Sequence, residues 1–365
     1  MDNQRDNWTG LPSEIKESII WFLDFNDRVS LSFCSKLDYT TERDAPFGIV
    51  SIKINDTNRE QFEIYDQDND NEDIRIEFGN GMNKSEWIFM RRDGFTEMVW
   101  MEYEKDGNIN MKRRHIIDNS DYYQEAIKFF NIWVYKCRNH VEELSIEMEN
   151  HSTEDIKLVR LNKCHSIRIH HQNEEQMEKL MNKLNVEMRN VELISHESDP
   201  NNNILSSQFL SLPQIRNSKN VSLSFNSVFT DDQLLNIQTK HLYFESDYVT
   251  DQSLNKFYRK WANGNGVDGF AQLVMAIRAN RSVNNEEILE GLEVRKWDNE
   301  FIKENRRFVE EFECVIGKGI CYQISSRTRN GLSATLLLSR YNIVFIVTGQ
   351  QLIINGKQTT VYKIR

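Results

Sequence analysis

The sequence predicts a multidomain α+β protein with a helical N-terminus, an antiparallel β block, a repeated α/β array and a β-rich C-terminal end. Three observations support this. Apolar residues near the N-terminus have helical spacing, those in residues 49–116 alternate with the period of a strand, and a short apolar pattern returns from Val141 onward. We expect the regions to span residues 8–46, 47–118, 119–300 and 301–365.

Composition and charge exclude several classes of protein. The chain has 365 residues, with 45 Lys and Arg against 56 Asp and Glu, and its net charge of −11 disfavours nucleic acid as the ligand. Its five cysteines include no CxxC pair, so a disulfide scaffold is not expected. Polar residues interrupt the most apolar stretch, 332–347, so we expect no membrane span. With no leader pattern at the N-terminus, we expect a cytoplasmic or nuclear protein.

The N-terminal segment predicts short helices that are apolar on more than one face. Pro12 suits a first helical turn, and Ile15, Ile19 and Leu23 form one stripe. Further apolar residues follow at 20–22, more than a segment of this length can bury alone. The segment is therefore either a cap on the next domain or a module whose second face binds another protein.

Residues 8–46 contain a run of positions that reads Leu11-Pro12-x-x-Ile15, Ile19, Leu23, Asp24, Asp27-Arg28, Leu31-Ser32 and Cys34-x-Lys36. This run resembles an F-box, the motif that docks on the Skp-family adaptor of cullin–RING ubiquitin ligases. The resemblance implies that the adaptor surface is formed or supported by Leu11, Pro12, Ile15, Ile19, Leu23 and Leu31.

The next region predicts an antiparallel sheet followed by an amphipathic helix. Apolar residues alternate at 50–54, 74–78, 87–89 and 99–103, and helical spacing runs from Tyr123 to Cys137, with Ser120 as a possible N-cap. Asp66, Asp68 and Asp70 with Glu77 approach an EF-hand calcium loop, but strand-like flanks and the missing glycine favour a solvated acidic turn.

A unit of apolar-x-x-apolar-x-apolar recurs in the third region at a mean spacing of about 25 residues. We interpret it as a degenerate leucine-rich-repeat-like array, with an α/β domain of unrelated strands as the alternative. The positions between the apolar residues would line a parallel sheet that binds a target protein. The candidate target-binding residues on that sheet are Glu143, Arg168, His170, Lys240, His241 and Tyr243. The central apolar residues of the successive units are Leu144, Ile167, Val191, Val221, Leu242, Leu273 and Leu292.

A second resemblance lies within this array. Leu254-Asn255-x-Phe257-x-x-x-Trp261-x-x-Gly264, after the strand-like Leu242-Tyr-Phe-Glu-Ser, is similar to the F-box-associated region of the nematode F-box B family. Leu254, Phe257 and Trp261 share one side of a helix, so we expect them in the core rather than at a site.

No pattern in the sequence predicts catalysis, a cofactor or a metal. Gly264-x-Gly266-x-x-Gly269 spells a dinucleotide fingerprint, but a helix precedes it and a strand follows, the reverse of the required order. His170 and His171 would point to opposite faces of a strand. We therefore expect a non-catalytic protein.

Together, the resemblances imply the substrate-recognition subunit of a Skp–cullin–F-box E3 ubiquitin ligase. Its partners would be the Skp-family adaptor, a cullin–RING ligase bound through that adaptor, and an unknown target protein. Two alternatives remain: a non-ligase interaction scaffold, and an enzyme with converging titratable groups in a pocket.

Overall fold

The computed structural model forms two compact units, residues 1–168 with 179–185, and residues 169–178 with 186–365. The four regions predicted from the sequence divide the chain differently, and their boundaries stay predictions. The residues that the structure describes are 8, 10–21, 23, 28, 31, 34–44, 49–56, 72–79, 84–103, 109–170, 173–194, 204–277, 281–327, 331–354 and 357–364.

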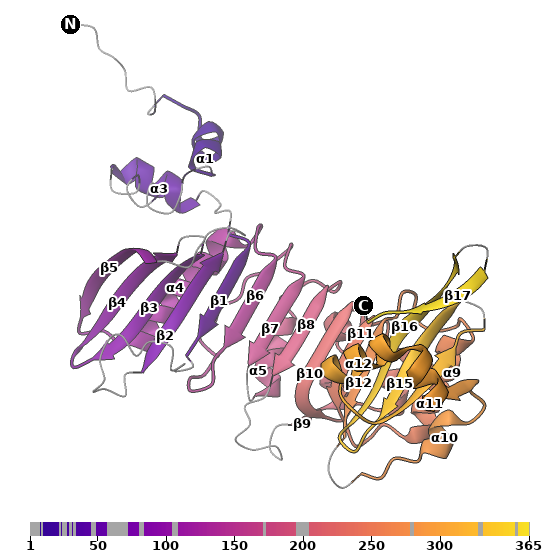
Figure 1. Cartoon of the computed structure of the whole chain (residues 1–365). Helices are drawn as coiled ribbons and strands as arrows, with labels where there is room; N and C mark the ends of the chain where they lie inside the picture. The colour runs from indigo at the N-terminus through magenta and orange to yellow at the C-terminus, as the bar shows by residue number, and fades with distance from the viewer. Residues whose placement is uncertain are drawn as a thin grey trace, which may run out of the picture. The chain divides into compact units, whose positions relative to one another are not determined.

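The N-terminal part of the first unit contains helices α1 (Ser13–Trp21) and α3 (Lys36–Asp44), and we call residues 8–44 the N-terminal module (Figure 1). The Ser35 hydroxyl oxygen accepts the backbone N–H of Asp38 at 3.1 Å, as an N-cap does. The Asp38 carboxylate in turn accepts from the Ser35 hydroxyl at 2.7 Å and from the Trp8 indole N–H at 2.6 Å. These bonds tie the start of the module to α3.

The rest of the first unit is a sheet with one long helix against it. Strands β1 to β5 pair antiparallel in chain order, as predicted, and β6 adds to β1 in parallel with Ile52 opposite Leu144. Helix α4 packs on β2, β3 and β4, where Phe78 contacts Phe129 and Trp133. The bounds are β1 Ser51–Asn55, β2 Asp73–Gly79, β3 Lys84–Arg92, β4 Phe95–Tyr103, β5 Ile109–Asp118, α4 Tyr122–Cys137 and β6 Glu143–Glu147.

Helix α4 matches the predicted helix, but its N-cap is Asp121 rather than Ser120. The Asp121 carboxylate accepts the Gln124 N–H at 2.9 Å, whereas the Ser120 hydroxyl donates to the Ile117 carbonyl at 2.7 Å. A carboxylate satisfies a free N–H and also interacts favourably with the positive end of the helix dipole. Ser120 instead closes the turn that leads into the helix.

The second unit contains a ladder of parallel strands at predicted positions. Val191, Val221, Leu242 and Leu273 stand opposite one another in β8, β10, β11 and β12, and all four are buried. Residues on either side of them in each strand face the other way, because side chains alternate along a strand. The boundary between the two units runs through β7 (Ser166–His170) and α5 (Glu174–Met181). The bounds that follow are β8 Asn190–Ile194, β9 Ile204–Leu205, α6 Ser207–Leu210, α7 Pro213–Arg216, β10 Asn220–Ser227, α8 Asp231–Asn236, β11 His241–Glu245, α9 Asp251–Ala262 and β12 Gln272–Ala276.

The last predicted repeat, around Leu292, is wrong. The far edge of β12 is occupied by β16, which pairs with it antiparallel, so no further parallel strand adds there. Val294 instead begins β13, which pairs antiparallel with β14. The leucine-rich-repeat character of the array stays a prediction. The remaining bounds are α10 Asn285–Leu289, β13 Val294–Lys296, α11 Asn299–Glu304, α12 Arg306–Val315, β14 Ile320–Ser325, β15 Leu332–Leu338, β16 Asn342–Ile354 and β17 Lys357–Tyr362.

Helices cover both faces of the C-terminal strands. Phe345 of β16 contacts Tyr258 and Trp261 of α9, with ring centroids 4.7 and 5.1 Å apart. Its neighbours Val344 and Ile346 point to the opposite face, into a cluster with aromatic residues of α11 and α12. Trp261, Leu254 and Phe257 are buried, as the sequence predicts.

A buried ion cluster connects the N-terminal module to α4. Glu42 of α3 accepts from Arg28 Nε at 3.1 Å and from Lys136 Nζ at 2.9 Å. The side chains of Arg28, Glu42 and Lys136 are 1%, 9% and 9% exposed. Burial lowers the pKa of Lys136 and of Arg28, and their bonds to Glu42 oppose that shift. One carboxylate thus compensates two buried cations.

We expect Glu42→Gln to destabilise the N-terminal module by about 3–5 kcal/mol, because it leaves two buried cations without their counter-charge. Amide hydrogen exchange in α3 measures this local free energy of opening. The control is Glu310→Gln, which removes an exposed ion pair with Arg306 and should change stability by less than about 0.5 kcal/mol. Equal effects of the two substitutions would contradict the structural role of the cluster.

The module should also lose stability in acid through Asp38. Hydrogen bonds from the Ser35 hydroxyl and the Trp8 indole hold the pKa of Asp38 below its usual range. A carboxyl whose pKa is lower in the folded state contributes stability above its unfolded value of about 3.9 and loses it as the pH falls further.

We therefore expect Asp38→Asn to weaken α3 by about 2 kcal/mol at neutral pH, the range for bonds to a charged group. The difference from the native protein should shrink as the pH falls below about 3.9, because the carboxyl of the unfolded chain then binds a proton more readily than the folded one. Hydrogen exchange in α3 across this range measures it. A difference that stays constant with pH would show that the charge of Asp38 contributes nothing.

Candidate functional site

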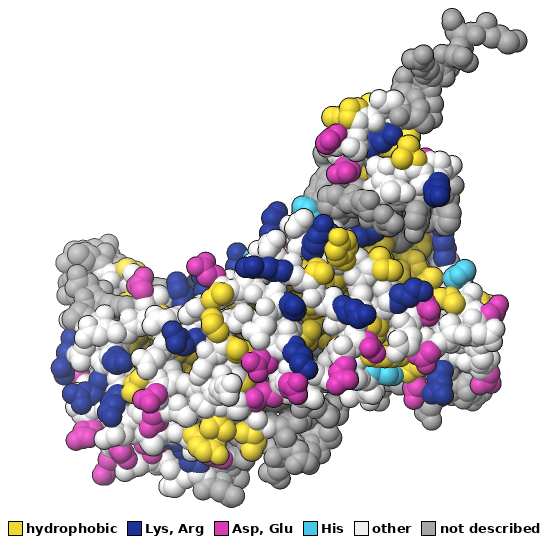
Figure 2. Space-filling model, turned by 180° about the vertical axis from the view of Figure 1, so that it is seen from behind, with side chains coloured by type: hydrophobic (Ala, Val, Ile, Leu, Met, Phe, Trp, Pro, Cys, Tyr) yellow, Lys and Arg dark blue, Asp and Glu magenta, His cyan; other side chains and the backbone are white. Residues whose placement is uncertain are grey.

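The first candidate site is the outer face of α1. Ile15 and Ile19 are 47% and 40% exposed and lie one helical turn apart, and Pro12 at the start of the helix is exposed too. Lys16 and Ile20 are buried on the other side of the same helix. Figure 2 shows hydrophobic side chains at the surface of this module. The helix therefore has an inner face in contact with the module and an outer apolar face.

The other predicted adaptor residues are less exposed. Leu11, Leu23 and Leu31 are half-buried. They can support the outer face or contribute part of their own surface to it. Their role in binding an adaptor stays a prediction.

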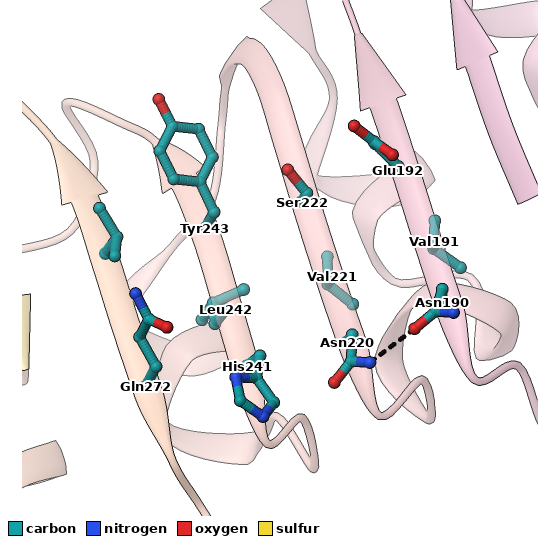
Figure 3. A pocket seen from close by; sticks show the side chains of 11 residues that line it. Asn190, Val191, Glu192, Asn220, Val221, Ser222, His241, Leu242, Tyr243 and Gln272 are labelled. Atoms are coloured by element: carbon teal, nitrogen blue, oxygen red, sulfur yellow. Dashed lines mark hydrogen bonds between the residues drawn. The ribbon is translucent and has the colours of Figure 1, made fainter. Parts of the chain in front are cut away.

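The second candidate site is a hollow of about 280 Å³ over the outward face of β8, β10, β11 and β12 (Figure 3). The strand register arranges its lining in two levels. The first level contains Asn190, Asn220, His241 and Gln272, and the second contains Glu192, Ser222, Tyr243 and Val274.

The lining of the hollow combines polar side chains with apolar residues, Val191, Val221 and Leu242 along the strands and Val274 at one end. Asn220 Nδ2 donates to Asn190 Oδ1 at 2.5 Å. In the part of the chain that the structure describes, the side chains of Ser222, His241 and Tyr243 make no hydrogen bond. At β12, Val274 packs against the apolar cluster of α11 and α12, which forms the apolar end. The hollow thus combines available hydrogen-bonding groups with one exposed aromatic ring.

The hollow brings together two of the six predicted target-binding residues, His241 and Tyr243. Lys240 is not part of the lining, and its Nζ lies close to Gly269 in the loop after α9. Glu143 and Arg168 belong to the first unit, where Arg168 Nη1 lies 3.9 Å from Glu147. His170 is half-buried in β7. A target-binding role for any of the six stays a prediction.

Sequence reasoning missed three polar residues of the hollow. Asn190, Asn220 and Gln272 each stand two positions before another outward residue of the same strand. The strand period alone could have found them, because positions two apart share a face. Like His241, which was predicted, each of them directly precedes the central residue of its apolar unit.

A chain of titratable groups in the first unit was also missed. Asp56 accepts from His151 Nδ1 at 2.9 Å, and His151 Nε2 lies 2.8 Å from the hydroxyl of Tyr122, which donates to Glu72 at 2.9 Å. Burial and Glu72 raise the pKa of the Tyr122 hydroxyl, the wrong direction for a nucleophile. Asp56 also accepts three backbone N–H groups of residues 149–151, which explains the chain as a loop anchor.

The cysteines offer no activated nucleophile in the buried part of the fold. Burial raises the pKa of Cys137, Cys164 and Cys321 to about 12, whereas a reactive thiol needs a lowered value.

Among the described residues there is no group of three or more His, Cys, Asp or Glu that could hold a metal ion. The acidic turn at Asp66–Asp70 lies outside the described residues.

The glycine-rich segment has the predicted order. Helix α9 ends at Ala262, the turn follows, and β12 begins at Gln272. Gly264 has φ = 76°, a conformation that favours glycine, and a Cβ on Gly266 would lie 3.0 Å from the Trp261 Cα. These glycines therefore serve the turn and its close packing.

No helix among the described residues is long and apolar enough to span a membrane.

Comparisons with known proteins agree with these features. Residues 8–49 match the F-box domain, and residues 211–267, which contain β10, β11 and α9, match the family described as F-box associated. The chain is 27% identical over 360 residues to an uncharacterized F-box protein of Caenorhabditis elegans, covering 98% of this chain and 92% of that protein. No solved structure matches significantly. As the sequence resemblance predicts, the chain carries an F-box followed by an F-box-associated region.

Proposed function

We propose that the chain is the substrate-recognition subunit of a Skp–cullin–F-box E3 ubiquitin ligase. The observation that carries the proposal is the F-box match at residues 8–49, together with the exposed Ile15 and Ile19 on α1. In this proposal the F-box binds the Skp-family adaptor, which connects the chain to a cullin–RING ligase. The outward, leucine-rich-repeat-like face of the second unit holds a target protein.

The energetic basis for adaptor binding is burial of the outer face of α1. Fully burying an isoleucine side chain contributes about 1.5–3 kcal/mol. Because Ile15 and Ile19 are 47% and 40% exposed, burying what remains of both contributes about 1–3 kcal/mol of the roughly 8 kcal/mol that a micromolar affinity needs. In this proposal the exposed Pro12 extends the surface at the start of the helix, and the half-buried Leu11 supports it. The inner face of α1 remains in the module, so binding requires no unfolding of the helix.

The chain would contribute proximity rather than chemistry. Holding a target beside the catalytic subunits raises its effective concentration for ubiquitin transfer. Such a role needs no activated nucleophile, cofactor or metal in this chain. We place the assembly in the cytoplasm or the nucleus, with no nucleic acid or membrane as a partner.

The test is co-expression with a Skp-family adaptor, followed by pull-down of the full chain. Changing both Ile15→Asp and Ile19→Asp should weaken adaptor binding at least about 100-fold, because two carboxylates would be desolvated in the interface. Both residues are exposed, so the protein should remain folded.

The matched control is Ile116→Asp, since Ile116 is exposed in β5, outside the F-box. It should bind the adaptor as the native chain does. If folded native protein fails to bind, or if the double variant binds equally well, the ligase assignment is wrong. The chain would then be a scaffold that binds proteins independently of a ligase.

A further inference from the structure

The first level of the hollow matches an extended peptide in length. Asn190, Asn220, His241 and Gln272 lie side by side in four neighbouring strands. Neighbouring strands are about 4.8 Å apart, so this level spans about 14 Å. An extended chain advances about 3.4 Å per residue, which makes the level about four residues long.

The chemistry of this level also suits a peptide main chain. The amides of Asn190, Asn220 and Gln272 each carry donors and an acceptor, as a peptide group does. His241 is exposed, and its ring nitrogens can donate or accept. A peptide lying across the strands could therefore satisfy its N–H and C=O groups without sheet pairing.

The second level forms a notch suited to one side chain. Ser222 is small and stands between Glu192 in β8 and Tyr243 in β11 (Figure 3). Tyr243 is 38% exposed and offers an aromatic face. An aromatic ring and a carboxylate on opposite sides of a gap attract a Lys or Arg side chain.

The formal charges of this face favour a cation as well. The outward positions of β8, β10, β11 and β12 are occupied by two carboxylates, Glu192 and Glu245, and by no Lys or Arg. The whole chain carries a net charge of −11, which also attracts basic segments. An acidic segment would be repelled by Glu192 in the second level and by Glu245 beyond it.

We propose that this hollow binds an extended segment of the target protein and lodges a Lys or Arg side chain over Ser222, between Tyr243 and Glu192. The proposal rests on the proposed receptor function and adds the class of ligand. The segment runs across the strands, with its main chain along the level of Asn190, Asn220 and Gln272. The apolar end at Val274 accommodates an apolar residue of the same segment.

The probe is a random dodecapeptide phage library, selected against the purified full chain. Native protein should select peptides that contain Lys or Arg. Ser222→Trp fills the notch, so it should not select them. For a selected peptide, Glu192→Gln should weaken binding about tenfold, the effect of losing one charge-assisted hydrogen bond.

Two substitutions are matched controls. Glu245→Gln removes the other outward carboxylate, and Tyr248→Ala removes an exposed tyrosine, both outside the lining of the hollow. Both should bind the selected peptides as native protein does. If native protein selects no peptides, or selects peptides without basic residues, or if Ser222→Trp binds them equally well, the proposal is overturned.

The same preparations separate this proposal from the proposed function. Each variant is also tested for adaptor binding, which depends on α1. Retained adaptor binding with failed peptide selection overturns the ligand class alone. Peptide binding by a chain that does not bind an adaptor overturns the ligase assignment and leaves the peptide site.

Discussion

The alternation of side chains in the parallel ladder is the constraint on which most of this account depends. Val191, Val221, Leu242 and Leu273 align in register and point into the core. Because neighbouring positions must then point outward, the same register assembles the hollow from residues far apart in the chain. A slip of one residue would bury Tyr243 and Glu192 and expose the core. Fold and candidate site are therefore specified by one set of contacts.

The N-terminal module is shaped by a different constraint. It has more apolar side chains than a segment of its size can bury. Its helices bury Ile20 inside and leave Ile15 and Ile19 outside. The Glu42 cluster with Arg28 and Lys136 joins the module to α4 without using that outer face. A buried ion cluster of this kind contributes less stability than apolar packing but demands one geometry. The arrangement leaves the apolar face of α1 available to a partner.

Much of the fold could be predicted because local patterns determine it. The strand period of β1–β4, the helix at Tyr122–Cys137 and the buried residues of α9 all follow from spacing alone. The prediction of a repeat around Leu292 was wrong because the last strand of an array depends on which other strand pairs with its edge. Here that strand is β16, which lies at least 66 residues further along the chain than its partners in β12. The ion cluster joins residues 28, 42 and 136, a set that no periodicity connects. The hollow required the register of four strands, so only part of its lining could be found.

The central claim is that the adaptor binds the N-terminal module, chiefly through α1, while the outward face of the ladder stays free for a target. Amide hydrogen exchange of the full chain, with and without a Skp-family adaptor, tests it directly. The account predicts protection in α1 and at the start of the module, with unchanged exchange in β8, β10, β11 and β12. Protection of those strands, or unchanged exchange throughout α1, would contradict it.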